Sequence, residues 1–153
     1  MPIPIASDHA GLPLKQALIA ALAAEGLSFD DLGTHGPESV DYPDFAHAVC
    51  AKVEGGQAFG ILVCGTGIGM AIAANRHPGI RAAVLHSATE ARLTRAHNNA
   101  NIACLGARMV GIEVALDAIR AFLATQFEGG RHERRLQKLD PALAKQGAAG
   151  AKP

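Results

Sequence analysis

The sequence predicts an α/β protein, a three-layer α/β/α domain with a five-stranded parallel sheet. Short apolar segments alternate with segments of helical periodicity along the chain, which is typical of a parallel sheet covered by helices on both faces. Within the apolar segments, such as Phe59–Cys64, apolar and polar residues do not alternate, as expected of strands buried on both faces. A length of 153 residues indicates one domain, expected over residues 1–145, with a small, disordered tail over 146–153.

The amino-terminal half is expected to contain three strands separated by two helices. Pro4 weakens the first strand, because proline cannot donate to a sheet. Gly26 can end the first helix, and the second helix carries Phe45, Val49 and Val53 on one stripe. In order, the expected elements are a strand at Ile3–Ala6, a helix at Leu12–Glu25, a strand at Ser28–Leu32, a helix at Asp41–Val53 and a strand at Phe59–Cys64.

The carboxyl-terminal half continues the alternation. A helix that starts in glycine follows the third strand, and Ser87 can cap the next helix, because serine accepts a hydrogen bond from a backbone amide of the first turn. In order, the expected elements are a helix at Gly67–Asn75, a strand at Ala82–Leu85, a helix at Thr89–His97, a strand at Asn101–Leu105 and a helix at Val110–Phe122.

Composition excludes several classes of protein. The chain has 14 basic and 14 acidic residues and is 49% hydrophobic, which argues against disorder and general nucleic-acid binding. Three cysteines at irregular spacing do not resemble a disulfide framework. The N-terminus lacks the features of a secretory signal, and the longest apolar runs, Ala17–Ala24 and Ala58–Cys64, are too short for a membrane helix. We therefore expect a cytoplasmic protein that binds neither membranes nor nucleic acid.

The sharpest motif is the loop Cys64-Gly65-Thr66-Gly67-Ile68-Gly69. At a strand-to-helix turn its bare backbone amides favour an anion, although a tight turn that needs glycine would look the same. A dinucleotide fingerprint would need glycine at position 70, and a cysteine phosphatase loop would need arginine there, but the residue is Met70. The Gly-Lys-Ser/Thr of a phosphate-binding P-loop is also absent. The motif therefore indicates an anion site of another kind.

Cys64 is the cysteine whose position suggests chemistry. It ends a buried strand directly before the glycine loop, where backbone amides favour a thiolate. It could act as a nucleophile or as a base, or be a small buried hydrophobe. We expect that last role for Cys50, on a helix, and for Cys104, inside a strand.

Polar residues follow several of the expected elements, and we expect them to converge on one edge of the sheet. Parallel sheets bind ligands at the carboxyl ends of their strands. The segments concerned are Ser7–Gly11, Cys64–Gly69, His97–Asn99 and Gly106–Arg108.

A basic segment near the C-terminus is open to two interpretations. If it is helical, Arg131 and Arg135 share a face, and two guanidinium groups suit a phosphate dianion. Equally, they could form a solvated patch or pair with Glu128 and Glu133. The seven histidines show no metal-ligand spacing such as HExxH, so we expect no metal and no cofactor.

Six segments of the chain strongly resemble type B ribose-5-phosphate isomerases, the RpiB/LacAB sugar-phosphate isomerase family. The resemblance runs in the expected order over roughly residues 3–139. The matching segments are Ser7-Asp8-His9-Ala10-Gly11, Asp41-Tyr42-Pro43, Cys64-Gly65-Thr66-Gly67-Ile68-Gly69, Ala73-Ala74-Asn75, His97-Asn98-Asn99-Ala100-Asn101 and Glu128-Gly129-Gly130-Arg131-His132.

The resemblance implies a Rossmann-like subunit that interconverts ribose 5-phosphate and ribulose 5-phosphate through a cis-enediolate without a metal. It also implies a homodimer, sometimes a tetramer, with active sites at the subunit interface. Cys64 matches the proton-transfer base of the cysteine subtype, and His97 matches the ring-opening residue, with Thr66 nearby as a further catalytic residue. The substrate-binding positions it implies are Asp8, His9, Gly65, Thr66, Gly67, Ile68, Gly69, Asn98, Arg108, Arg131 and Arg135.

Three other functions remain open at this stage. A relative in the same family could act on erythrulose 4-phosphate, allose 6-phosphate or galactose 6-phosphate. A non-catalytic sugar-phosphate sensor would bind without turnover, which the retention of Cys64 and His97 disfavours. A cysteine hydrolase would need an oriented His-Asp pair, which the sequence does not show.

Overall fold

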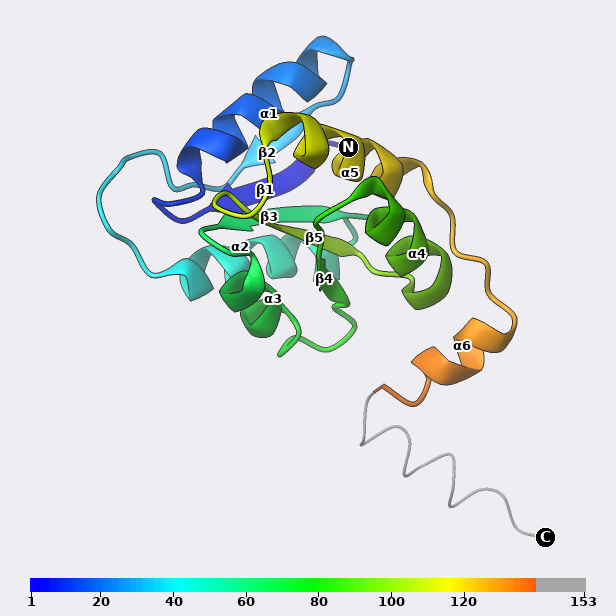
Figure 1. Cartoon of the computed structure of the whole chain (residues 1–153). Coiled ribbons are helices and arrows are strands. Elements are labelled where there is room, and N and C mark those ends of the chain that lie inside the picture. Colours follow the sequence, from blue (N-terminus) through cyan, green and yellow to red (C-terminus); the bar gives the residue numbers. More distant parts are fainter. Residues whose placement is uncertain (140–153) are drawn as a thin grey trace, which may run out of the picture.

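The computed structural model describes residues 1–139, so the boundary at 145 and the tail at 146–153 lie outside the described residues. The expected α/β/α architecture is confirmed (Figure 1). Five strands pair in parallel in the order β2-β1-β3-β5-β4. They are β1 (Ile3–Ser7), β2 (Phe29–Asp31), β3 (Gly60–Cys64), β4 (Ala82–Val84) and β5 (Ile102–Gly106).

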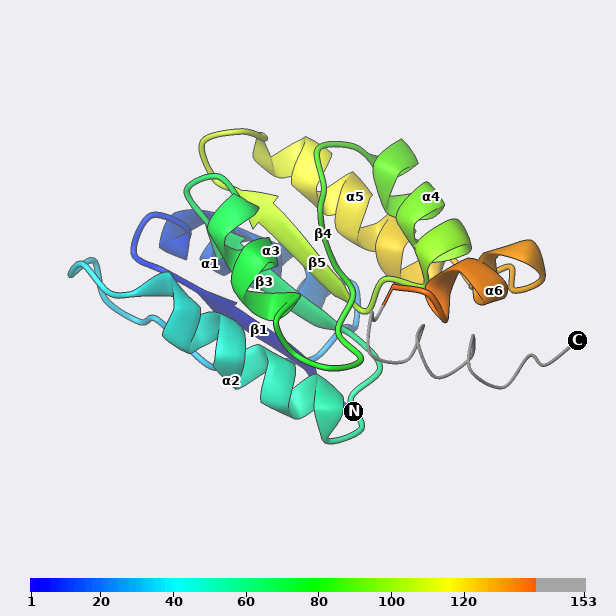
Figure 2. The same ribbon diagram turned by 90° about the horizontal axis from the view of Figure 1, so that it is seen from below.

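Helices cover both faces of the sheet, as Figure 2 shows. α1, α4 and α5 pack on one face, and α2 and α3 pack on the other. Their bounds are α1 (Leu12–Ala24), α2 (Tyr42–Glu54), α3 (Ile68–Ala74), α4 (Ala88–Asn98), α5 (Ile112–Ala124) and a short α6 (Arg131–Leu136). Each predicted element is present, and no end is displaced by more than two residues. Ser87 caps α4 as predicted, its Oγ accepting the Glu90 N–H at 3.1 Å.

Successive residues of the central strands face opposite helical layers. Ile61 and Val63 pack towards α1 and α5, whereas Leu62 and Cys64 pack towards α2 and α3. This is the period of two that a pleated strand imposes. The expectation that the strands are buried on both faces holds for nearly all residues of β1, β3 and β5. In contrast, β2 and β4 are only half-buried, because each is an edge strand of the sheet.

The two cysteines expected in the core lie there. Cys50 on α2 and Cys104 in β5 are fully buried, and all three cysteines are free thiols. Burial, assisted by the nearby Glu54 carboxylate, raises the pKa of Cys50 to about 12, and burial also raises the pKa of Cys104. Both side chains therefore stay protonated near neutral pH and act as small apolar groups.

A buried lysine on α1 holds the end of β2 and the loop that follows it. Lys15 is fully buried and donates to Asp31 Oδ1 at 2.5 Å and to the Thr34 carbonyl at 2.8 Å. The Thr34 N–H in turn donates to the Ser7 carbonyl at 2.7 Å. The pairing compensates the desolvation of the ammonium group and holds this loop beside the polar residues that follow β1. Among residues 1–139, no helix is both long enough and apolar enough to span a membrane.

Candidate active site

The glycine loop joins β3 to α3 and places a cysteine sulfur against a backbone amide. Cys64 is only 4% exposed, and its Sγ accepts the Gly67 N–H at 3.1 Å. Gly67 has φ +78°, a conformation that glycine adopts without strain. A backbone donor is therefore aimed directly at the sulfur atom.

A second loop, after β5, is bonded to the glycine loop. The Ala107 N–H donates to the Cys64 carbonyl at 2.8 Å, and the Arg108 N–H donates to the Gly65 carbonyl at 3.0 Å. These bonds bring the exposed Arg108 side chain over the loop, where a Cβ on Gly65 would lie 3.5 Å from the guanidinium carbon. A cation therefore stands beside the glycine loop, where it would strengthen the binding of an anion.

The residues after β1 complete this edge of the sheet. Asp8 is buried, and its Oδ1 accepts the Gly11 N–H at 2.8 Å. His9 Nδ1 accepts the Val40 N–H at 3.3 Å. Because Nδ1 is an acceptor, the ring proton lies on Nε2, which can then donate to a ligand.

Tyr42 lies at the candidate site, although the sequence analysis did not single it out. A Cβ on Gly69 would lie 2.8 Å from the Tyr42 ring, so the aromatic ring packs directly over the glycine loop at the start of α2. The available signal was that Tyr42 is the chain's single tyrosine, within the quoted Asp41-Tyr42-Pro43 segment.

We expect Gly67→Ala to destabilise the fold more than Gly26→Ala. Both glycines have positive φ, so each alanine carries left-handed strain of about 1 kcal/mol. At Gly67 the new Cβ would also lie 3.0 Å from the Leu105 carbonyl carbon, whereas at Gly26 nothing lies within 4 Å. The crowding adds about 1–3 kcal/mol. Urea unfolding of both variants measures the difference, and equal losses would contradict the crowding.

The remaining predicted site residues lie at the opposite end of the strands, the amino end. The expectation that all these polar segments converge at the carboxyl end is therefore wrong for His97–Asn99. This segment lies at the end of α4 and leads into β5, whose first residue Ile102 pairs with Gly60, while Cys64 pairs with Gly106. Four strand residues separate these levels, a distance of about 13 Å. A segment that follows a helix lies where the next parallel strand begins, not where it ends.

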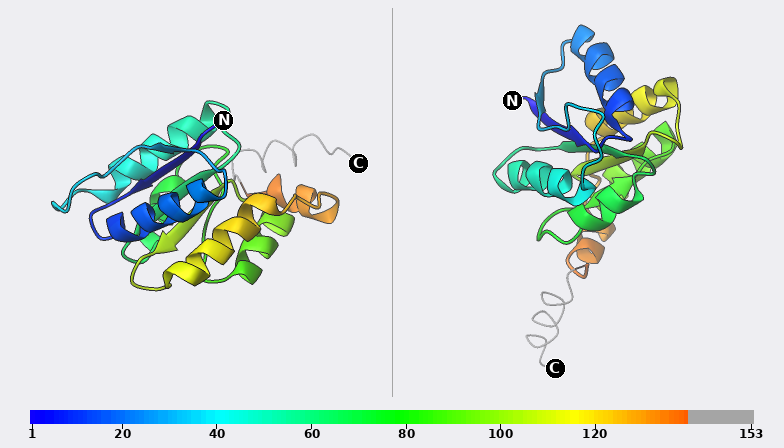
Figure 3. Two further views of the ribbon diagram at one scale, coloured as in Figure 1. Left: turned by 90° about the horizontal axis from the view of Figure 1, so that it is seen from above. Right: turned by 90° about the vertical axis from the view of Figure 1, so that its left-hand side faces the viewer.

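Arg131 and Arg135 belong to this second end of the sheet. Their segment is helical, as α6, and it packs against α4. Figure 3 shows α6 beyond the end of α4, away from the strands' carboxyl ends. We call Asp8, His9, Gly65–Gly69 and Arg108 the loop half-site. We call His97, Asn98, Arg131 and Arg135 the helix half-site. One chain does not bring the two together.

A buried histidine that the sequence analysis did not single out lies beside the helix half-site. His132 is 6% exposed, and its ring stacks on His97 with centroids 4.4 Å apart and planes 12° apart. Desolvation first, then the neighbouring His97 and Arg131, lowers the pKa of His132. Glu128 lies on the other side, with its Oε2 3.7 Å from His132 Nε2.

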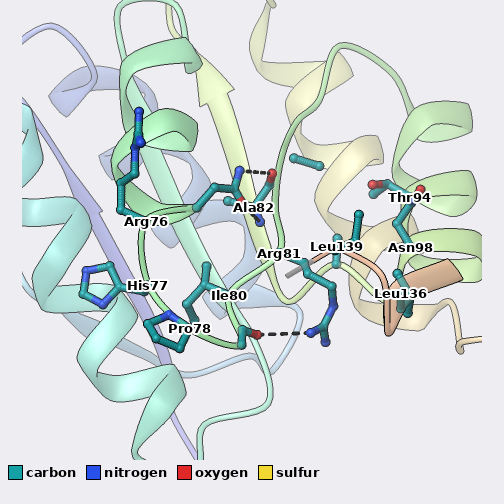
Figure 4. A pocket seen from close by; sticks show the side chains of 14 residues that line it. Arg76, His77, Pro78, Ile80, Arg81, Ala82, Thr94, Asn98, Leu136 and Leu139 are labelled. Atoms are coloured by element: carbon teal, nitrogen blue, oxygen red, sulfur yellow. Dashed lines mark hydrogen bonds between the residues drawn. The ribbon is translucent and has the colours of Figure 1, made fainter. Parts of the chain in front are cut away.

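A hollow of about 670 Å³ runs along the edge strand β4, as Figure 4 shows. Asn98 and Leu136 line one side, and the loop between α3 and β4 lines the other. Asn75 bonds to the backbone of Ala82 through both its amide nitrogen and its amide oxygen, each at 2.9 Å. The Asn75 side chain thus pairs with part of the edge strand β4. The hollow connects this strand with the helix half-site, because Asn98 also lines it.

Comparison with known proteins shows which family the chain belongs to. Residues 3–139 match the model of the family described as "Ribose/Galactose Isomerase". The chain belongs to this family. It is 44% identical to the ribose-5-phosphate isomerase B of Escherichia coli strain K12 over 133 residues, which cover 86% of this chain and 89% of that protein.

Solved structures of the family share the fold. The ribose-5-phosphate isomerase B of Clostridium thermocellum is 48% identical, with a TM-score of 0.90, and the match covers 95% of this chain and 99% of the other. The enzyme of Mycoplasma genitalium, whose structure has bound ribulose 5-phosphate, is 40% identical, with a TM-score of 0.86, over 95% of this chain and 96% of the other. The Rossmann-like fold expected from the sequence is thereby confirmed for this isomerase family member.

Proposed function

We propose that this protein interconverts ribose 5-phosphate and ribulose 5-phosphate. The observation that carries the proposal is the Cys64 sulfur, held at 3.1 Å from the Gly67 N–H in a glycine loop at the end of β3. The family and the relatives named above, one of them with bound ribulose 5-phosphate, support the choice of substrate.

Cys64 is the base in this proposal. Its thiolate removes the proton from C2 of the open-chain aldose, which leaves a cis-enediolate, and the thiol returns a proton to C1 while the proton on O2 is replaced by one on O1. Backbone amides stabilise the oxyanion as it forms. The Gly67 and Ile68 N–H groups are engaged within the loop, with Sγ and with Thr66 Oγ1 at 3.3 Å. We therefore assign the enediolate to the amides of Gly65, Thr66 and Gly69.

A complete site on this proposal needs two subunits. Asp8 binds sugar hydroxyl groups, and His9 and Arg108 bind the phosphate beside the loop. The partner's His97 moves the ring-oxygen proton to open the furanose, with Thr66 nearby, and the partner's Asn98, Arg131 and Arg135 complete the substrate contacts. The separation of the loop and helix half-sites within one chain supports this division.

The face beside β4 supports a homodimer. Ile68 and Ile72, one helical turn apart on α3, are 54% and 55% exposed, and Leu93 on α4 is 49% exposed. These apolar side chains project from the helices that precede and follow the half-buried edge strand β4, and burying them against a second copy is favourable. We further place the protein in the cytoplasm, in keeping with its three free cysteines.

Solvent exchange tests the proposed reaction. In deuterium oxide, the protein should convert ribose 5-phosphate to ribulose 5-phosphate and introduce deuterium at C1 of the product, because the proton on Cys64 exchanges with solvent between the two transfers. Proton nuclear magnetic resonance measures the incorporation. Binding without turnover would contradict the proposal, and faster turnover of allose 6-phosphate or a tetrose phosphate would favour another substrate of the family.

A further inference from the structure

A group of potential metal-ligating side chains lies beside the helix half-site and shares His97 with it. One potential ligand atom from each of His97, Glu128 and His132 lies within 4.8 Å of the other two. We propose that these residues form a binding site for a divalent transition metal ion that prefers imidazole ligands, such as Co²⁺, Ni²⁺ or Zn²⁺. Two imidazoles and one carboxylate are a ligand set that such ions accept, with a position left open for water.

The buried histidine is the fixed ligand. His132 is 6% exposed, and its Nε2 has no hydrogen-bond partner among residues 1–139. The Glu128 carboxylate, at 3.7 Å, is too distant to serve as one. A buried polar atom without a partner costs free energy, and a metal ion bound to Nε2 would remove that cost.

The other two ligands can reach an ion held by His132. Ligands about 2.1 Å from a tetrahedral ion lie roughly 3.4 Å apart, so ligand atoms that are now up to 4.8 Å apart have to approach by as much as about 1.4 Å. The Glu128 side chain is 61% exposed and free to turn. The His97 ring is stacked nearly parallel to the His132 ring, so it has to rotate about Cβ–Cγ for the two lone pairs to meet.

Backbone contacts keep the three residues together. The Glu128 N–H donates to the Ala96 carbonyl at 3.1 Å, which holds the acidic residue beside the end of α4.

The guanidinium groups of Arg131 and Arg135 oppose a cation, since both lie close enough to affect the charge state of His132. We therefore expect binding of ions with high imidazole affinity and none of Mg²⁺, which prefers oxygen ligands.

Binding has a consequence that rests on the proposed function. A metal ion on His97 would occupy the lone pair that opens the sugar ring and would inhibit the isomerase. The same side chains would then serve catalysis when free and inhibition when metallated.

The test measures binding directly, by calorimetric titration of the full chain with Co²⁺ and by the visible absorption of the bound ion. We expect one Co²⁺ per chain. Glu128→Gln should weaken the affinity roughly tenfold or more, whereas Glu133→Gln, the same change at an exposed residue of α6, should leave it unchanged. Equal affinities for the two variants would overturn the proposal.

Cys64 is the competing metal ligand, and a second variant separates it. Cys64→Ala should bind Co²⁺ as the unaltered chain does, without a sulfur-to-metal charge-transfer band in either protein. Loss of binding in Cys64→Ala would overturn the proposal by placing the ion on the thiol. Binding measured without substrate is independent of turnover, so a Glu128-dependent site in an inactive protein would refute only the proposed isomerase.

Discussion

Cys64→Ala is expected to abolish isomerisation of ribose 5-phosphate while leaving sugar-phosphate binding nearly intact. The methyl group cannot accept the C2 proton, and the Gly67 N–H loses the sulfur that it contacts at 3.1 Å. A correctly positioned general base accounts for several orders of magnitude in rate. Steady-state kinetics measure kcat, and calorimetric titration with ribose 5-phosphate measures binding.

Cys50→Ala is the matched control for this substitution. It removes the same thiol from a fully buried position on α2, where burial keeps the group protonated. The variant should lose some stability, about 1 kcal/mol for a small core truncation, and retain its kcat. Measurable turnover by Cys64→Ala at a rate close to that of Cys50→Ala would disprove the role of Cys64 as base.

Two inactive variants are expected to restore activity to each other when they share a dimer. In a mixed dimer of Cys64→Ala and His97→Ala, one site combines Cys64 of one chain with His97 of its partner, and the other site carries both defects. Random association makes half of the dimers mixed, and half of their sites are intact. Unfolding and refolding an equal mixture should therefore recover about one quarter of the unaltered specific activity.

The control replaces one member of the mixture. Cys64→Ala refolded with the double variant Cys64→Ala/His97→Ala has no intact pair in any dimer and should stay inactive. If the first mixture also stays inactive although mixed dimers form, His97 acts with Cys64 of its own chain, and the two-subunit site is wrong. The ribose 5-phosphate assay on both mixtures decides between these outcomes.

The predicted fold was accurate because its signals are local. The unbroken apolar run that became β3, the stripe on α2 and the serine that caps α4 each depend on neighbouring residues in the chain. The edge strands were the exception. β2 and β4 are half-buried because sheet order decides which strands lie at an edge, and the order depends on contacts between distant segments.

The loop half-site could be predicted for the same reason. Cys64, the glycines and Thr66 lie in one continuous segment, and the rule that parallel strands present their carboxyl ends together brings Asp8 and Arg108 beside them. Tyr42 was missed because its contact with Gly69 joins segments far apart in sequence. Glu128 and His132 lack recognisable metal spacing, since their third companion, His97, lies on α4.

The sequence by itself determined a neutral α/β chain with a cysteine at the start of a glycine loop. Only the tertiary structure decided that His97, Asn98 and the arginines of α6 lie at the amino end of the sheet. The physical reason is that the connection between two parallel strands returns the chain to the amino end of the sheet. Residues after a helix and residues after a strand therefore lie at opposite ends of the strands. The distance between the two half-sites is therefore a property of the fold, and on our proposal a second copy of the chain closes it.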